Sequence, residues 1–267
     1  MSKKNLASAR FFLGYSLCYD LVFWEVVLIE LEKEGLIYKL TMDAGENRWN
    51  TTFVRQFSAA LDQVEQDDGS GALVTCATDP KFFSNGLDLD WVQSPETHPE
   101  GGDREPFGSE FMYLMGRIIT LSIPSICAIN GHAFGAGFMM ALCHDVRIMR
   151  EDRGFLCANE MQLGMTIPRP ELALFRHKLP ADIFFETVQL SKRWTGPMAL
   201  DAGIVQATES VDKLVGSVLR KAEELAPLAN NRANFRAQKE SLYGENAAIN
   251  IEHGPAHMLK NSEQFLS

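Results

Sequence analysis

A glycine-rich segment between two apolar runs constrains this chain most. It reads Ile129-Asn130-Gly131-His132-Ala133-Phe134-Gly135-Ala136-Gly137-Phe138 and precedes apolar, helix-compatible residues 139–142. The small residues at 135–137 let a backbone turn bring its N–H groups close to a ligand. At the N-terminus of a helix, unpaired N–H donors and the helix dipole favour negative charge. The segment therefore predicts a site for a phosphate or for an oxyanion that develops during a reaction.

Length and composition indicate a folded chain with one large domain, or one domain with an appendage. Of the 267 residues, 46% are hydrophobic and 22% are charged, so a sizeable core can be buried. The formal net charge of −10 argues against nucleic-acid binding, which needs a basic face, although a few local cations could still hold a small anionic ligand. The cysteines form no CxxC pair and no zinc pattern, so we expect buried thiols in a reducing compartment: Cys18, Cys76, Cys127, Cys143 and Cys157.

The hydrophobic pattern predicts an α/β fold. Residues 26–32 and 36–42 read as a hairpin, and residues 53–64 as a helix capped by Thr51 or Thr52. Short apolar runs predict strands at 72–77, 126–129, 146–149 and 155–157, with a helix at 111–121 and an exposed loop at 94–108. From residue 170 onward the pattern is helical. We therefore divide the chain into an N-terminal extension (1–25), a core (26–205) and a helical C-terminal region (206–267).

The two ends of the sequence bear on compartment. Residues 1–19 lack acidic side chains and contain Ser, Arg and Lys, which fits either a cleaved targeting segment or a variable extension. The apolar stretch 11–29 is interrupted by Asp20 and Glu25, so we expect no membrane span. The last residues, Gln264 to Ser267, are not a peroxisomal address of the Ser-Lys-Leu type.

Two separate segments look like backbone donor loops. One is residues 82–89 (Phe-Phe-Ser-Asn-Gly-Leu-Asp-Leu), and the other is the glycine turn at 135–137. Two N–H groups from separate loops can converge on one carbonyl oxygen and stabilise charge that develops in the transition state. Either loop alone is a weak signal, but the pair predicts an oxyanion hole.

The two loops, in this order, resemble the enoyl-CoA hydratase/isomerase (crotonase) family. The resemblance covers about residues 26–225 and also rests on residues 46–50 (Glu-Asn-Arg-Trp-Asn), 124–137, 144–145, 159–165 (Asn-Glu-Met-Gln-Leu-Gly-Met), 194–196 and 199–205. It implies a spiral of ββα units with a helical C-terminal trimerisation region. It also implies an acyl-CoA thioester substrate, a homotrimer or dimer of trimers, and no metal or organic cofactor, since coenzyme A is part of the substrate.

The same resemblance assigns the residues of the site. The Leu87 and Ala136 N–H groups stand at the two oxyanion-hole positions. The family often has Gly where this chain has Ala136, so the hole requires a backbone conformation there that tolerates a Cβ. The expected substrate-binding residues are Arg48, Lys81, Ser84, Asn85, Gly86, Asp88, Leu89, Gly135, Gly137 and Met139.

The acid/base group decides the reaction. Hydratases of the family carry two glutamates; here the first position is Met139 and the second is Glu160. One carboxylate can shuttle a proton between two carbons of one substrate, which favours moving a double bond from the 3,4 to the 2,3 position. The segment 152–160 looks like the plant-type and peroxisomal Δ3,Δ2-enoyl-CoA isomerases. The resemblance thus implies an isomerase of unsaturated fatty acid beta-oxidation, in a peroxisome or mitochondrion, otherwise in the cytoplasm.

Several of these residues also have an ordinary structural interpretation. Asp88 reads best as a turn cap, and Arg48 and Lys81 either meet CoA phosphates or are ordinary surface charges. His132 and His144 lack a nucleophile or metal-ligand neighbour, so we expect both to be structural. For the whole chain, hydration, dienoyl isomerisation, decarboxylation and thioester hydrolysis remain alternatives within the fold. Non-catalytic acyl-CoA binding or RNA interaction is the alternative of another class.

Overall fold

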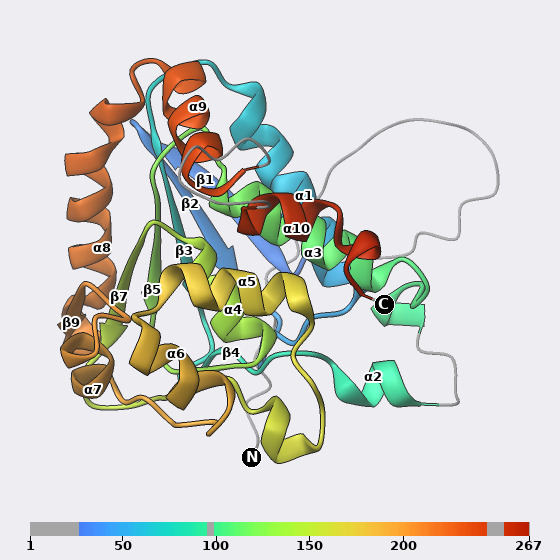
Figure 1. The fold of residues 1–267 in the computed structure, drawn as a ribbon. Coiled ribbons are helices and arrows are strands. Elements are labelled where there is room, and N and C mark those ends of the chain that lie inside the picture. Colours follow the sequence, from blue (N-terminus) through green and yellow to red (C-terminus); the bar gives the residue numbers. More distant parts are fainter. Residues whose placement is uncertain (1–26, 95–98, 245–253, 267) are drawn as a thin grey trace, which may run out of the picture.

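The computed structural model describes residues 27–94, 99–244 and 254–266 (Figure 1). The predicted extension at 1–25 lies outside these residues. A six-stranded sheet has the order β1-β2-β3-β5-β7-β9, with β1 antiparallel to β2 and all other neighbours parallel. Its strands are β1 (Ile29–Glu34), β2 (Ile37–Met42), β3 (Ala72–Ala77), β5 (Ser125–Ile129), β7 (Val146–Arg150) and β9 (Ala207–Glu209).

A second, parallel sheet of three short strands runs beside the first. It has the order β4-β6-β8, formed by β4 (Phe82–Ser84), β6 (His132–Phe134) and β8 (Leu156–Cys157). The chain alternates between the sheets, since β3 is followed by β4, β5 by β6, and β7 by β8. Each pair is followed by helical segments, which confirms the expected spiral of ββα units. The hydrophobic pattern did not predict β4, β6 and β9, and β9 lies inside the region expected to be helical.

Helices cover both faces of the larger sheet. Helix α8 (Val211–Leu225) packs on one face, where Val74 of β3 meets Leu214 and Val218. The adjacent residue Leu73 belongs to the larger core on the opposite face, as the alternation of a strand requires. That core contains α1 (Thr51–Gln66) and α3 (Phe107–Ile119), which contact each other. In Figure 1, α8 accordingly stands on one side of the strands, and α1 and α3 stand on the other.

Helix α1 begins at a different cap from the one expected. Asn50 is the N-cap, and its side chain accepts a hydrogen bond from the Phe53 N–H at 3.0 Å. The prediction of Thr51 or Thr52 as the cap was therefore wrong. Asn is among the best N-cap residues, because its short side chain reaches an otherwise unpaired N–H of the first turn. Phe53 and Phe57 face the core, as the helical spacing predicted.

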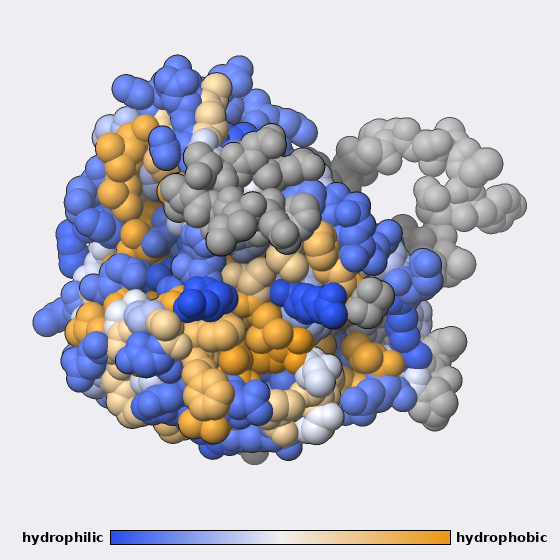
Figure 2. All heavy atoms as spheres, in the orientation of Figure 1, coloured by the Kyte–Doolittle hydropathy of each residue, from blue (hydrophilic) through white to orange (hydrophobic). Residues whose placement is uncertain are grey.

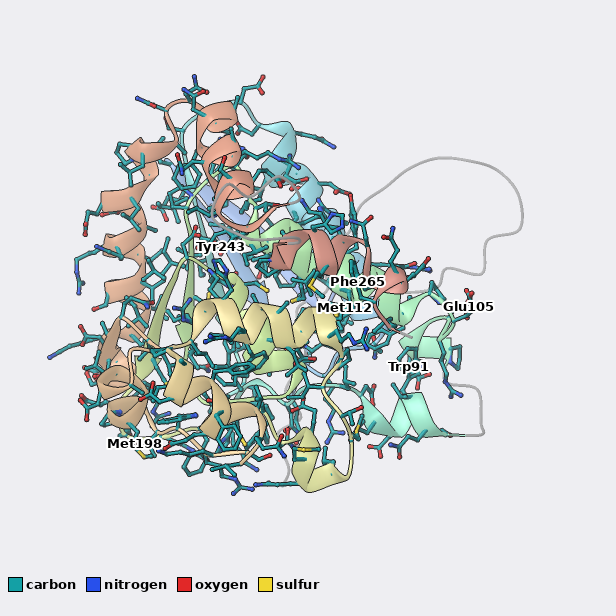
Figure 3. All side chains as sticks on the ribbon, in the orientation of Figure 1. Trp91, Glu105, Met112, Met198, Tyr243 and Phe265 are labelled. Carbon is teal, nitrogen blue, oxygen red and sulfur yellow. The ribbon has the colours of Figure 1, made fainter. Side chains whose placement is uncertain are left out.

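The last part of the chain folds back over the core. Helix α10 (Pro255–Lys260) contacts α3 and α5 (Arg169–Lys178), and the turn η4 (Ser262–Gln264) also contacts α3. Figure 3 accordingly shows Phe265 close to Met112 of α3. The remaining helices are α2 (Leu89–Gln93), α4 (Ala136–Cys143), α6 (Ala181–Val188), α7 (Gly196–Asp201) and α9 (Arg232–Tyr243), with short turns η1 (Pro99–Gly101), η2 (Glu160–Leu163) and η3 (Ala226–Ala229).

The surface is mixed in character. Figure 2 shows hydrophobic residues gathered over and below α5, between strongly hydrophilic patches. Exposed apolar side chains of this part of the chain include Leu163, Phe185 and Leu190. None of the helices within the described ranges combines the length and hydropathy that crossing a membrane requires.

Candidate active site

The two glycine loops and Glu160 line one cavity. It has a volume of about 180 Å³ and lies where the loop after β4, the start of α4 and the turn η2 meet. Eight of the residues expected in the site line it: Arg48, Asn85, Gly86, Leu87, Leu89, Gly135, Ala136 and Glu160. Asn159, Leu163 and Met165 complete the lining. Residues more than 100 positions apart in the sequence are therefore brought together as the resemblance implied.

Glycines allow these loops to approach so closely. Gly86 has a φ of +80°, and a Cβ there would lie 2.8 Å from the Phe134 carbonyl oxygen. Gly135 has a φ of +46°, and a Cβ there would lie 2.9 Å from Oε1 of Glu160. Both positions therefore require glycine, for backbone conformation and for space. Gly135 in particular sets the carboxylate of Glu160 directly against the backbone of the glycine turn.

The two residues expected to donate backbone N–H groups, Leu87 and Ala136, both line the cavity. Within the described segments, neither the Leu87 nor the Ala136 N–H donates a backbone hydrogen bond in a turn or loop. Ala136 is the first residue of α4, where an N–H has no partner inside the helix. Its φ is not positive, so the Cβ that distinguishes it from glycine causes no backbone strain. Both N–H groups are thus available to a ligand oxygen in the cavity.

Glu160 is the acidic side chain that lines the cavity. It begins the turn η2, and its Oε2 is buried without a hydrogen-bond partner. Burial raises the pKa of this carboxyl above its usual value, because a charged form is poorly solvated there. A carboxylate with a raised pKa is a stronger base than one on the surface, so Glu160 suits proton abstraction.

Polar groups at one edge of the cavity form a small network. The Arg48 Nε donates to Oε2 of Glu46 at 2.8 Å, and the Asn85 Nδ2 donates to the same oxygen at 2.7 Å. Arg48 also lies 3.5 Å from Asp90, whose side chain is almost fully exposed. The guanidinium of Arg48 is therefore held at the cavity edge while it remains partly open to solvent.

The other expected binding residues do not line the cavity. Lys81 lies 4.6 Å from the centre of the Phe82 ring. Asp88 caps α2, accepting the Trp91 N–H at 3.3 Å, which confirms the turn-cap interpretation. Ser84, Gly137 and Met139 are packed in the scaffold: Met139 is fully buried, and a Cβ on Gly137 would lie 2.5 Å from the Ser84 carbonyl oxygen.

The two histidines have structural surroundings, as expected. His144 is fully buried and bonded to the Thr75 hydroxyl at 2.8 Å and the Met140 carbonyl at 3.0 Å. Burial lowers its pKa to about 4, so it is neutral at physiological pH. His132 stacks on Phe134 with ring centres 5.2 Å apart. Neither histidine lines the cavity.

One ionisable residue near the site was missed. Glu171, in the first turn of α5, is 6% exposed, and its Oε1 is buried without a hydrogen-bond partner. Burial, and after it the charge of Glu160, raises the pKa of Glu171 well above its usual value. No motif or spacing marks this residue in the sequence. The only signal was an acidic residue inside an otherwise apolar helix start, at residues 170–175.

Comparison with known proteins places the chain among acyl-CoA enzymes. The family model described as enoyl-CoA hydratase/isomerase matches residues 32–261. A peroxisomal enoyl-CoA delta isomerase 2 of Arabidopsis thaliana is 32% identical over 82% of this chain and 93% of its own length. A carnitinyl-CoA dehydratase of Salmonella enteritidis is 30% identical over 85% and 84%.

A solved structure gives the same result. The probable enoyl-CoA hydratase of Mycobacterium tuberculosis superimposes with a TM-score of 0.72, at 26% identity, over 80% of this chain and 88% of that one. The family match, at residues 32–261, spans more than half of the 267-residue sequence. This chain therefore belongs to the enoyl-CoA hydratase/isomerase family, and its fold is the crotonase fold.

Proposed function

We propose that this protein is a Δ3,Δ2-enoyl-CoA isomerase. The observation that carries the proposal is the placement of one glutamate, Glu160, in a cavity that Leu87 and Ala136 also line. An enoyl-CoA delta isomerase at 32% identity supports the same activity. The substrate is a 3-enoyl-CoA, and the product is the trans-2-enoyl-CoA.

The reaction needs one proton moved between two carbons. Glu160 removes a proton from C2, and the electrons of that C–H bond move into a dienolate whose oxygen accepts hydrogen bonds from Leu87 and Ala136. The protonated Glu160 then returns the proton at C4, the double bond comes to rest between C2 and C3, and the carboxylate is restored. The two N–H groups lower the barrier because the negative charge on oxygen is larger in the dienolate than in the thioester.

The residue at the other acid/base position favours isomerisation over hydration. Met139 occupies that position and is fully buried in the scaffold. A thioether neither gives nor takes a proton, so no second side chain there can hold a water molecule against C3. One carboxylate in the cavity is enough for a proton shuttle between C2 and C4.

Hydration or dehydration is the second candidate function. Glu171 is a second buried carboxyl whose charge interacts with that of Glu160, and a carnitinyl-CoA dehydratase is 30% identical to this chain. Because Glu171 does not line the cavity, it is not placed to orient water on a bound substrate. This is why the isomerase remains the better supported candidate.

A paired assay separates the two candidates. The purified protein is given a 3-enoyl-CoA and, separately, a trans-2-enoyl-CoA, and the absorbance of the conjugated thioester is followed. We expect that absorbance to rise with the first substrate and to stay almost constant with the second. A rapid fall with the second substrate would assign the protein to the hydratases, and no reaction in either would leave an acyl-CoA-binding role.

Compartment and assembly belong to the same proposal. We expect a peroxisomal protein, in line with the peroxisomal name of the Arabidopsis relative, and a homotrimer or dimer of trimers as in the family. A fluorescent fusion viewed with a peroxisomal marker tests the compartment, and light scattering of the purified protein tests the assembly. Diffuse fluorescence or a monomer mass would refute the corresponding expectation.

A further inference from the structure

Glu171 is a buried acid without an obvious structural role. It is 6% exposed, and among the described residues its Oε1 has no hydrogen-bond partner. Native proteins rarely leave a buried carboxyl oxygen unpaired, because such a group costs free energy and stabilises nothing. An exception of this kind therefore points to a role in the chemistry of the neighbouring site.

Glu160 and Glu171 form a buried carboxyl pair. Both have a side-chain oxygen that is buried and unpartnered. Oε1 of Glu160 lies against Gly135, the N-cap of α4, and α4 packs against α5, which carries Glu171. The charge of Glu160 accordingly raises the pKa of Glu171. Only eleven positions separate them: the chain runs through η2 from Glu160 to Leu163, turns at Gly164, and enters α5 at Arg169. Two carboxylates that share a poorly solvated region resist being ionised together.

Within the described segments, no cation lowers the pKa of Glu171. Helix α5 packs against α4, α6 and α10. Glu160 is the only charged group that shifts the pKa of Glu171 among the described residues, and it raises that pKa. The titratable groups on α5 itself and on these helices are Arg169, Arg176, His177, Lys178, Cys143, Asp182, Glu186, His257 and Lys260. The dipole of α5 favours ionisation of Glu171, but this effect is smaller than that of full burial.

We propose that Glu171 is a positioning residue that acts through Glu160, staying protonated so that the buried pair carries a single negative charge, located on Glu160. The proposal rests on the proposed function, in which Glu160 is the base. Glu160 lines the cavity and Glu171 does not, so the charge lies on the carboxyl that faces the substrate. When Glu171 ionises at high pH, the second charge makes Glu160 a stronger base.

Infrared spectroscopy tests the pair without any assay of activity. A protonated carboxylic acid has a carbonyl band that a carboxylate lacks. We expect this band at pH 7 in the wild type, its loss in Glu171→Gln, and its survival in Glu160→Gln. In Glu160→Gln the band should also titrate at lower pH, because the charge that raised the pKa of Glu171 is gone. A wild-type spectrum at pH 7 without the band would overturn the proposal, even if neither variant folds.

The pH dependence of kcat/KM tests the link to catalysis. The wild type should show two ionisations: a rise as Glu160 ionises and a second, smaller rise as Glu171 ionises. Glu171→Gln should keep the first ionisation and lose the second. Superimposable pH profiles for the wild type and Glu171→Gln would overturn the proposal, because replacing a purely structural residue changes neither ionisation. If the wild type does not isomerise at all, the proposed function fails, and the infrared bands still decide whether the pair exists.

Discussion

Two buried polar regions of this molecule differ in how their groups are paired. Around Asp145, every charge has partners: its Oδ2 accepts from the Ser125 N–H at 2.8 Å and from the Lys239 ammonium at 2.6 Å. Around Glu160 and Glu171, each carboxyl has a buried oxygen with no partner. Burial alone would raise the pKa of Asp145, but the charges of Lys239 and Lys178 and the hydrogen bonds from Lys239 and Ser125 together lower it, whereas the pKa values of the two glutamates are raised.

This difference in pairing indicates that the region around Asp145 contributes to stability, whereas the region around Glu160 and Glu171 contributes to the reaction. A satisfied buried charge holds elements together, and here Lys239 ties α9 to the end of β5 through Asp145 and the Ile123 carbonyl. An unsatisfied carboxyl stabilises nothing and retains its affinity for a proton. Substitutions in the first region should therefore lower stability. In the second region, substitution of Glu160 should lower the rate, and replacement of Glu171 by an apolar residue should raise stability.

The largest effect is expected from removing the base. Glu160→Gln keeps the shape of the side chain and cannot accept a proton, so kcat for the 3-enoyl-CoA should fall by about 10²–10⁴-fold. Binding of the acyl-CoA should stay within a few-fold in calorimetric titration. The matched control is Glu186→Gln, which breaks an exposed pair with Lys192 and should leave kcat unchanged. Near wild-type turnover in Glu160→Gln would show that the base is another group.

Deleting one donor of the oxyanion hole should have the next largest effect. Ala136→Pro removes the N–H at the first position of α4, where proline is tolerated in a helix. We expect kcat to fall by about 10²–10³-fold in the isomerase assay. Ala136→Ser retains the N–H and serves as the control. Equal rates for the two variants would remove Ala136 from the site.

Breaking the satisfied region should cost stability and leave the chemistry alone. Lys239→Met leaves Asp145 without its cation, so the free energy of unfolding should fall by about 3 kcal/mol in a denaturant titration. The kcat of the folded fraction should not change. Lys221→Met, which breaks the exposed pair with Glu224, should cost less than about 1 kcal/mol. A rate loss in Lys239→Met without a stability loss would reverse the contrast between the regions.

The smallest effect is a gain in stability. Glu171→Leu replaces an unpaired buried carboxyl with an apolar side chain, and we expect a gain of about 1–2 kcal/mol at pH 7. A group whose pKa is raised on folding stabilises the fold only in its protonated form. The wild type therefore loses stability as pH rises above about 4.3, the pKa of a glutamate in the unfolded chain. The difference between the proteins should therefore shrink as pH falls toward 4. Calorimetric melting at both pH values checks this, and a destabilised variant at pH 7 would contradict it.

The sequence predicted most of the long elements and missed three short strands. The apolar run at 72–77 is β3 with the expected bounds, because a buried parallel strand reads as a continuous run of hydrophobic residues. Strands β4, β6 and β9 have three residues each, which is too few for any periodicity to be recognised. Their existence follows from pairing with other strands, and that is a tertiary property.

The candidate site was predicted where a motif marks it. Gly86, Gly135 and Glu160 lie in recognisable segments, and the structure brings all three to one cavity. Lys81 was assigned from the same motif but does not line the cavity. Glu171 could not be found, because its burial depends on how α5 packs against α4, α6 and α10, and no local pattern encodes that packing.

The central claim is that one carboxylate, Glu160, carries a proton from C2 to C4. A 3-enoyl-CoA labelled with deuterium at C2 tests it directly, with the product analysed by mass spectrometry and NMR after reaction in ordinary water. A measurable fraction of the deuterium should appear at C4, because the same buried group removes and returns it. Product that contains only solvent hydrogen at C4 would contradict the account and require separate acid and base groups.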